Sequence, residues 1–154
     1  MRVILAFVVA VLVAFFLGAA VLTGFDQAGF AAAHGGPLSF GQRLGWYLVT
    51  MKGLAIDVGL YPLLVTVGLL IAFLAAAFVK RIAPGLRFWW YAGAGAVAIV
   101  TLVLTLKAVM GLFVIPGART VAGIAAQGVV GLIAGGVFAA LSRAPEQRGR
   151  FSLR

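Results

Sequence analysis

The chain has 154 residues, of which 64% are hydrophobic and only 10% are charged, and its mean hydropathy is +1.19. A soluble domain averages about 45–50% apolar and about 25% charged residues. The composition of this chain therefore excludes a cytosolic enzyme, a secreted disulfide scaffold and a disordered tail. It predicts a protein embedded in the lipid bilayer. A net charge of +9 would suggest nucleic acid in a soluble protein, but here the basic residues lie between and after long apolar runs, as orientation signals do in membrane proteins, so we expect no nucleic acid partner.

Four long apolar runs, each with at most one charged residue, predict an all-α membrane protein. They cover residues 3–25, 58–79, 88–114 and 120–142. Each run exceeds the roughly 20 helical residues that cross a hydrocarbon core, whereas membrane strands need only about 10 residues of alternating polarity. We therefore predict one four-helix transmembrane domain over residues 1–143, followed by a basic polar tail over residues 144–154.

The distribution of lysine and arginine predicts the orientation of these spans. One side would carry eight cations, namely Arg2, Lys80, Arg81, Arg87, Arg143, Arg148, Arg150 and Arg154. The other side would carry three, namely Arg43, Lys52 and Arg119, while Lys107 lies within a span. Because cytoplasmic loops carry the excess of basic residues, we expect both termini in the cytoplasm and the protein in the inner (cytoplasmic) membrane.

The connection between the first two spans is long, since it covers residues 26–57 on the predicted outer side. A simple connection needs far fewer residues, so this loop is expected to carry structure of its own. Its first part, from Gly29 to Pro37, is rich in glycine and alanine and is expected to be irregular. A short helix is expected over residues 39–52, with Gly53 at its end.

Two patterns predict this short helix. Ser39 is followed three residues later by Gln42, which is a capping-box pattern. Apolar residues then recur at helical spacing, namely Phe40, Leu44, Tyr47, Leu48 and Met51. Such an amphipathic helix either lies at the outer membrane–water interface or folds over the bundle, and it serves either as a packing element or as a lid or docking element for a partner.

Lys107 is the one charged residue inside a predicted span. Ionisable residues inside a membrane are candidates for function, but Lys107 lies only about 10 Å below the expected helix end, a distance that a lysine side chain covers by snorkelling. Two interpretations stay open: a snorkelling or salt-bridged lysine, or a group that handles a substrate or an ion. Asp57, at the start of the second span, is the natural partner for Lys107 or Arg119, unless it only favours the N-terminus of its helix.

Small residues recur at a spacing of four along the last span, among them Gly123, Gly131 and Gly135. This spacing lets two membrane helices approach closely. We therefore predict close helix packing, within the bundle or in an oligomer, with Gly93 and Gly95 of the third span as counterparts.

Gln127 interrupts this row of small residues and lies about 12 Å below the expected start of the last helix. This depth matches that of Lys107 in the neighbouring antiparallel helix, so we predict a hydrogen bond between the two side chains. Asp57, Lys107, Arg119 and Gln127 would then form a polar cluster in the outer half of the bundle, beneath the helix of residues 39–52.

The chain lacks the residues of most membrane enzymes and cofactor sites. It has no cysteine and a single histidine, His34, so disulfides, thiolate catalysis, a haem held by two histidines and a histidine metal cluster are not expected. We expect no catalytic activity, no cofactor and no metal, and a binding role for His34 would need a second chain.

The expected function is that of a non-catalytic accessory subunit or homo-oligomer, whose partners are the bilayer and other membrane subunits or a second copy. The alternative is a small transporter or channel that uses the polar cluster.

Overall fold

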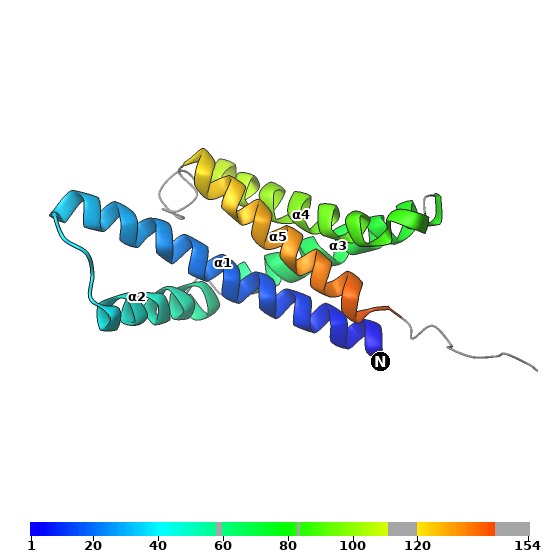
Figure 1. Ribbon diagram of the computed structural model, residues 1–154, viewed down its shortest axis with the longest axis horizontal. Helices are drawn as coiled ribbons and strands as arrows, with labels where there is room; N and C mark the ends of the chain where they lie inside the picture. Colours follow the sequence, from blue (N-terminus) through cyan, green and yellow to red (C-terminus); the bar gives the residue numbers. More distant parts are fainter. Residues whose placement is uncertain (58–59, 83, 111–119, 144–154) are drawn as a thin grey trace, which may run out of the picture.

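The computed structural model describes residues 1–57, 60–82, 84–110 and 120–143, and this part of the chain consists of helices and short turns (Figure 1). The elements are α1 (Arg2–His34), α2 (Phe40–Lys52), the π-helix η1 (Gly53–Asp57), α3 (Leu60–Ile82), the 3₁₀ turn η2 (Pro84–Leu86), α4 (Arg87–Met110) and α5 (Val121–Leu141). Four of these helices, α1, α3, α4 and α5, are long and apolar enough to cross a membrane. The prediction of an all-α protein with four candidate spans is therefore confirmed. The predicted tail, residues 144–154, lies outside the described residues.

α1 is longer than the apolar run that predicted it. The helix ends at His34 rather than at residue 25, so the prediction of an irregular segment from Gly29 to Pro37 is wrong up to His34. Alanine, the strongest helix former, is the commonest residue in this extension, and the first residue to break the helix is Gly35, whose φ of 74° is left-handed. With 33 residues, α1 is about 50 Å long and exceeds the thickness of a hydrocarbon core.

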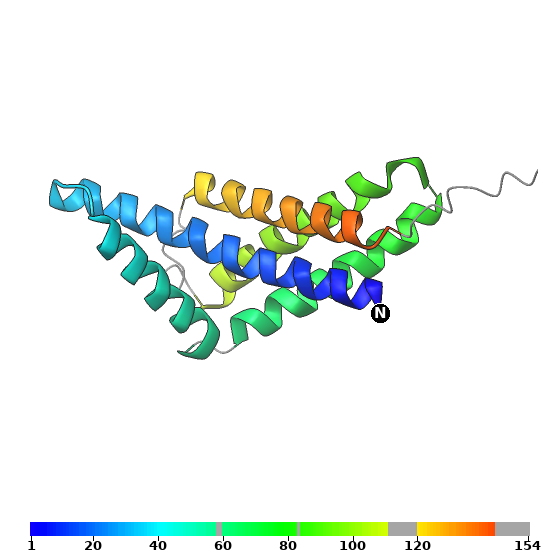
Figure 2. The same cartoon turned by 60° about the horizontal axis from the view of Figure 1, so that its bottom comes forward.

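α2 begins with a reciprocal cap. The Ser39 hydroxyl oxygen accepts a hydrogen bond from the Gln42 amide at 3.4 Å, while the Ser39 amide donates to Oε1 of Gln42 at 2.9 Å. α2 ends at Lys52, but Gly53 keeps right-handed angles, with φ −58° and ψ −48°. The chain therefore does not turn away at this glycine and continues as η1. α2 and α3 both run in the direction opposite to α1 (Figure 2).

α5 lies between α1 and α4 in the bundle, and α4 also packs against α3 (Figures 1 and 2). An aromatic cluster joins all four long helices. The rings of Phe73 and Phe138 stack with centroids 4.4 Å apart, and Tyr91 stands edge-on to both rings at 5.9 and 5.0 Å. Phe7 of α1 lies edge-on to Phe73 at 6.2 Å. The core of the bundle is therefore apolar and filled at this level.

α4 and α5 touch through their main chains. A Cβ atom added to Gly131 would lie 2.7 Å from the carbonyl carbon of Gly95, and one added to Gly135 would lie 2.8 Å from the carbonyl carbon of Tyr91. Small residues at a spacing of four permit such a close approach. Gly93, in contrast, faces open space. The glycine row of α5 is thus occupied by packing inside the bundle, along a contact that we call the glycine seam (Gly95, Gly131 and Gly135).

Candidate functional site

The predicted hydrogen bond between Lys107 and Gln127 is wrong. The glycine seam places Gly95 opposite Gly131 in antiparallel helices, so Lys107 lies level with the start of α5, and Gln127 lies about 12 Å further along the bundle. The prediction placed both side chains at equal depth below the expected ends of their helices, whereas the register of α4 against α5 is set by the contact of Gly95 with Gly131. The two side chains therefore lie at different depths and do not form one site.

The other predicted site residues occupy separate places. Arg119 lies outside the described residues, and Asp57 is the last residue of η1, with a side chain that also lies outside the described part. Lys107 is half-buried in the last turn of α4 and forms no ion pair with another described residue. Gly123 is buried at the start of α5, where its amide donates to the Thr120 hydroxyl at 3.0 Å.

Gln127 joins α5 to α1 rather than to α4. Its side chain is fully buried, and its Nε2 donates a hydrogen bond to the carbonyl oxygen of Gly18 at 3.0 Å. Its Oε1 has no hydrogen-bond partner among the described residues. Tyr61 of α3 lies beside the same glycine, because a Cβ atom added to Gly18 would be 3.3 Å from the Tyr61 hydroxyl and 3.4 Å from Oε1 of Gln127. Three helices thus meet at one buried polar position, which we call the Gly18 site (Gly18, Tyr61 and Gln127).

The described groups of the Gly18 site form or can form hydrogen bonds. A hydrogen bond between membrane helices stabilises a fold by about 0.6 kcal/mol on average and by up to about 1.7 kcal/mol, whereas a buried acceptor without a partner costs about 1–3 kcal/mol. The nearby buried Thr23 is already satisfied, since its hydroxyl donates to the carbonyl oxygen of Ala19 at 2.8 Å. The described groups of the site, an amide, a backbone carbonyl and a tyrosine hydroxyl, come from three helices and hold them together.

The sequence interpretation did not single out Gly18 or Tyr61, although α1 carries a signal. Buried small residues recur along α1 at a spacing of four, namely Ala6, Ala10, Ala14 and Gly18. Such a row marks a side on which other helices approach closely. Tyr61 has no comparable signal, because a tyrosine near the end of a span is also typical of the membrane interface.

A shallow apolar groove of about 370 Å³ lies between α1 and α5, further towards the C-terminus of α1 than the Gly18 site. It is lined by Val21, Gly24, Phe25, Ala28 and Ala126. None of these side chains carries a polar group, and the groove is wide open. Lipid tails can cover such a surface, so the groove does not by itself define a ligand.

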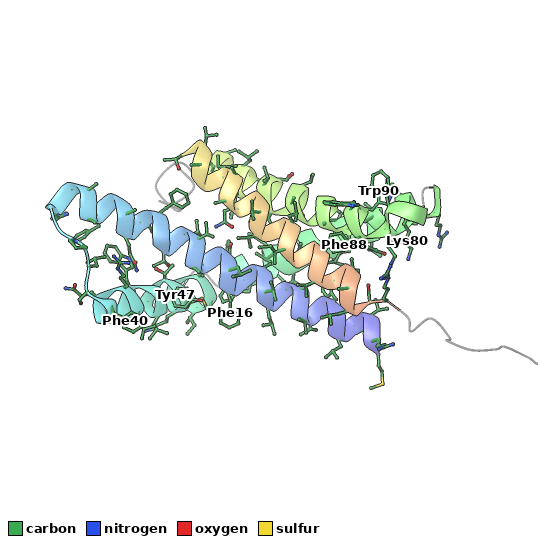
Figure 3. The ribbon with its side chains drawn as sticks, viewed as in Figure 1. Phe16, Phe40, Tyr47, Lys80, Phe88 and Trp90 are labelled. Atoms are coloured by element: carbon green, nitrogen blue, oxygen red, sulfur yellow. The ribbon has the colours of Figure 1, made fainter. Side chains whose placement is uncertain are left out.

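The last third of α1 and the whole of α2 form an arm beside the bundle. Nε2 of Gln27 donates to the carbonyl oxygen of Arg43 at 3.0 Å, and the Tyr47 hydroxyl donates to the carbonyl oxygen of Phe16 at 3.2 Å (Figure 3). These contacts order α2, yet no residue of α2 is buried. One apolar row of α2 is left exposed, and its exposed fractions are 81% for Phe40, 48% for Leu44 and 58% for Leu48. We call these three residues the outer stripe.

His34 lies at the tip of the arm. Its ring stacks on that of Phe30 with centroids 4.0 Å apart, and its Nδ1 lies 3.1 Å from the carbonyl oxygen of Phe30. No group of three or more possible metal ligands is found among the described residues. His34 therefore packs against the last turns of α1. Phe30 in turn contacts α2, because its ring lies edge-on to that of Trp46 at 5.2 Å.

These features define a class of protein. Four long apolar helices with lipid-exposed side chains make the chain a multi-pass membrane protein. Comparisons with models of protein families, with functionally characterised proteins and with solved structures find no match to this chain. Its function therefore has to be argued from its own residues.

Proposed function

We propose that this protein is a non-catalytic integral membrane protein that works by association, either as an accessory subunit of a larger membrane complex or as a homo-oligomer. The observation that supports this function is the arm. Its hydrogen bonds and aromatic contacts hold α2 against α1, yet they leave the outer stripe of Phe40, Leu44 and Leu48 uncovered by the chain itself. An ordered apolar surface outside the packing of the bundle is typical of a site that contacts a protein partner or the membrane.

We also propose an orientation for the protein. Both termini face the cytoplasm, the protein lies in the inner (cytoplasmic) membrane, and α2 lies at the outer membrane–water interface. The positive-inside rule supports this orientation, because Lys80, Arg81 and Arg87 flank the connection between α3 and α4. The half-buried Trp46 and Tyr47 of α2 are side chains that membrane interfaces favour.

Single cysteines test this orientation, because the chain has none of its own. Gly45 in α2 and Gly85 in η2 are both exposed, and a side chain added at either position meets nothing within 4 Å. Gly45→Cys is expected to react with a membrane-impermeant maleimide in intact cells, whereas Gly85→Cys is expected to react only after permeabilisation. Labelling of Gly85→Cys in intact cells would contradict the proposed orientation.

Association is tested by removing the apolar character of the outer stripe. A tagged Leu44→Ser/Leu48→Ser variant is expected to lose most of the partner, or of the second copy, that co-elutes with the unmodified protein from native membranes in a mild detergent. Truncating one of the few residues that dominate an interface weakens binding by more than about 1 kcal/mol. The two substitutions together should therefore reduce the co-eluting amount by more than about tenfold, as measured by mass spectrometry.

The matched control is Gly41→Ser/Gly45→Ser, which introduces the same two residues on α2 where nothing lies within 4 Å of an added side chain. This variant is expected to keep its partner. If the unmodified protein elutes alone as a monomer, the proposal of association fails. If both variants keep the partner, association uses another surface and the arm is not the docking element.

A small transporter or channel is the weaker alternative. The unpartnered Oε1 of Gln127 favours it, since polar groups inside spans often line substrate paths. However, transport needs a continuous polar path, and the stacked rings of Phe73, Tyr91 and Phe138 fill the bundle on the side towards the N-terminus of α1. Lys107 also lies too far along the bundle to line a cavity together with Gln127.

A further inference from the structure

The end of α3, the start of α4 and the end of α5 lie at the same end of the bundle as the N-terminus of α1 (Figure 2), and these helix ends carry most of the described cations. These cations are Arg2 at the start of α1, Lys80 and Arg81 at the end of α3, Arg87 at the start of α4 and Arg143 after α5. The acidic residues of the described chain lie elsewhere. Asp26 is about 36 Å along α1 from Arg2, and Asp57 is in η1, before the opposite end of α3. These cations therefore have no carboxylate of the described chain beside them.

Two of these cations are held in fixed positions by one aromatic ring. Nζ of Lys80 lies 5.8 Å from the centroid of the Tyr91 ring, and the guanidinium carbon of Arg87 lies 5.7 Å from the same centroid. Nη2 of Arg87 also donates a hydrogen bond to the Ser142 hydroxyl at 2.8 Å, which ties α4 to the end of α5. Both cationic side chains are half-buried, whereas the other described cations at this end are exposed.

Orientation alone does not explain this arrangement. The positive-inside rule depends on the number of cations near the ends of the spans and not on their exact placement. Here two like charges from two helices are held against one buried ring, although like charges repel each other. A pair of cations that has no carboxylate beside it among the described residues is an arrangement that an anion completes, and basic pockets between membrane helices bind lipid headgroups.

We propose that Lys80 and Arg87 bind the phosphate group of one anionic phospholipid. Arg87 has five N–H donors and uses one of them for Ser142, so donors remain for two phosphate oxygens, while Lys80 contributes a compact point charge. The source of the phosphate is a lipid rather than a free anion, because Phe88 and Trp89 follow Arg87 directly and are 48% and 63% exposed. Exposed aromatic rings are the side chains that membrane interfaces favour, so these two rings offer the acyl chains an apolar surface next to Arg87 (Phe88 and Lys80 are labelled in Figure 3).

The proposal is tested on the full chain in a neutral detergent by native mass spectrometry, with phosphatidylglycerol as the probe and phosphatidylcholine as the zwitterionic reference. The unmodified protein is expected to retain phosphatidylglycerol in preference to phosphatidylcholine. Each cation near an anionic headgroup contributes about fivefold in affinity. Lys80→Gln and Arg87→Gln are thus each expected to weaken binding about fivefold, and the double variant about 25-fold.

The matched control is Arg2→Gln/Arg81→Gln, which removes the same charge at the same end from exposed side chains that do not face Tyr91. This variant is expected to bind phosphatidylglycerol nearly as tightly as the unmodified protein. An equal loss in both double variants would mean diffuse attraction by net charge and would overturn the proposed site. Displacement of the lipid by millimolar inorganic phosphate would point to a free anion, and equal retention of both lipids would point to no site. Either result would also overturn the proposal.

Discussion

Gly135→Ala is expected to lower the free energy of unfolding by about 3 kcal/mol, although it adds only one methyl group. The new Cβ atom would lie 2.8 Å from the carbonyl carbon of Tyr91 and 2.9 Å from the Cα atom of Ala92. Both are backbone atoms and cannot rotate away, so α4 and α5 must separate. Overpacking a core costs about 1–3 kcal/mol, and we expect the upper end of this range because a whole helix pair has to move. Reversible unfolding in detergent micelles, followed by circular dichroism, measures the change.

Gly93→Ala is the matched control for this variant. Gly93 lies in the same helix pair, but nothing lies within 4 Å of a Cβ atom added there. Alanine is the better helix former by about 1 kcal/mol, so this variant is expected to be as stable as the unmodified protein or more stable. Equal loss of stability in Gly135→Ala and Gly93→Ala would show that helix propensity, and not the close approach of α4 and α5, decides the outcome.

The lengths of the four apolar runs were sufficient to predict the four candidate spans, since a bilayer requires about 20 apolar residues for each crossing. They were not sufficient to place the end of α1. The first charged residue after an apolar run marks where the apolar run stops, but a helix can continue beyond it. α1 does so through its alanine-rich segment to His34. The break at Gly35 could have been found, because a glycine after a run of good helix formers is a common helix end.

The polar contacts were harder to predict, because they depend on helix rotation and register. One residue corresponds to 100° around a helix and to about 1.5 Å along it, so small errors redirect a side chain to another neighbour. Gln127 was expected to face Lys107, but it faces Gly18 of α1. The spacing of Gly131 and Gly135 predicts a close approach, but only the three-dimensional structure assigns Gly95, and not Gly93, to the seam. The shared ring of Tyr91 beneath Lys80 and Arg87 likewise follows from the register of α3 against α4.

Gln127→Glu is expected to lower the free energy of unfolding by about 3 kcal/mol. Glutamate has nearly the same shape as glutamine, so packing at the Gly18 site is preserved and the change is electrostatic. The substitution replaces the Nε2 donor to the Gly18 carbonyl with an acceptor and puts a carboxylate at a fully buried position. A charged residue near the centre of a membrane helix costs about 2.5–3.5 kcal/mol. The same unfolding measurement in micelles determines the loss.

Gln127→Met separates the cost of the charge from the contribution of the amide. Methionine is similar in length, and it removes both the hydrogen bond to Gly18 and the unpartnered Oε1. The lost bond is worth about 0.6–1.7 kcal/mol in a membrane, and the removed acceptor returns about 1–3 kcal/mol, so the net change is expected to lie between a loss of about 1 kcal/mol and a gain of about 2 kcal/mol. A loss as large as that of Gln127→Glu would instead mean that Oε1 has a hydrogen-bond partner in the membrane. The Gly18 site would then bind a polar group, and the transporter alternative would gain the buried site that it needs.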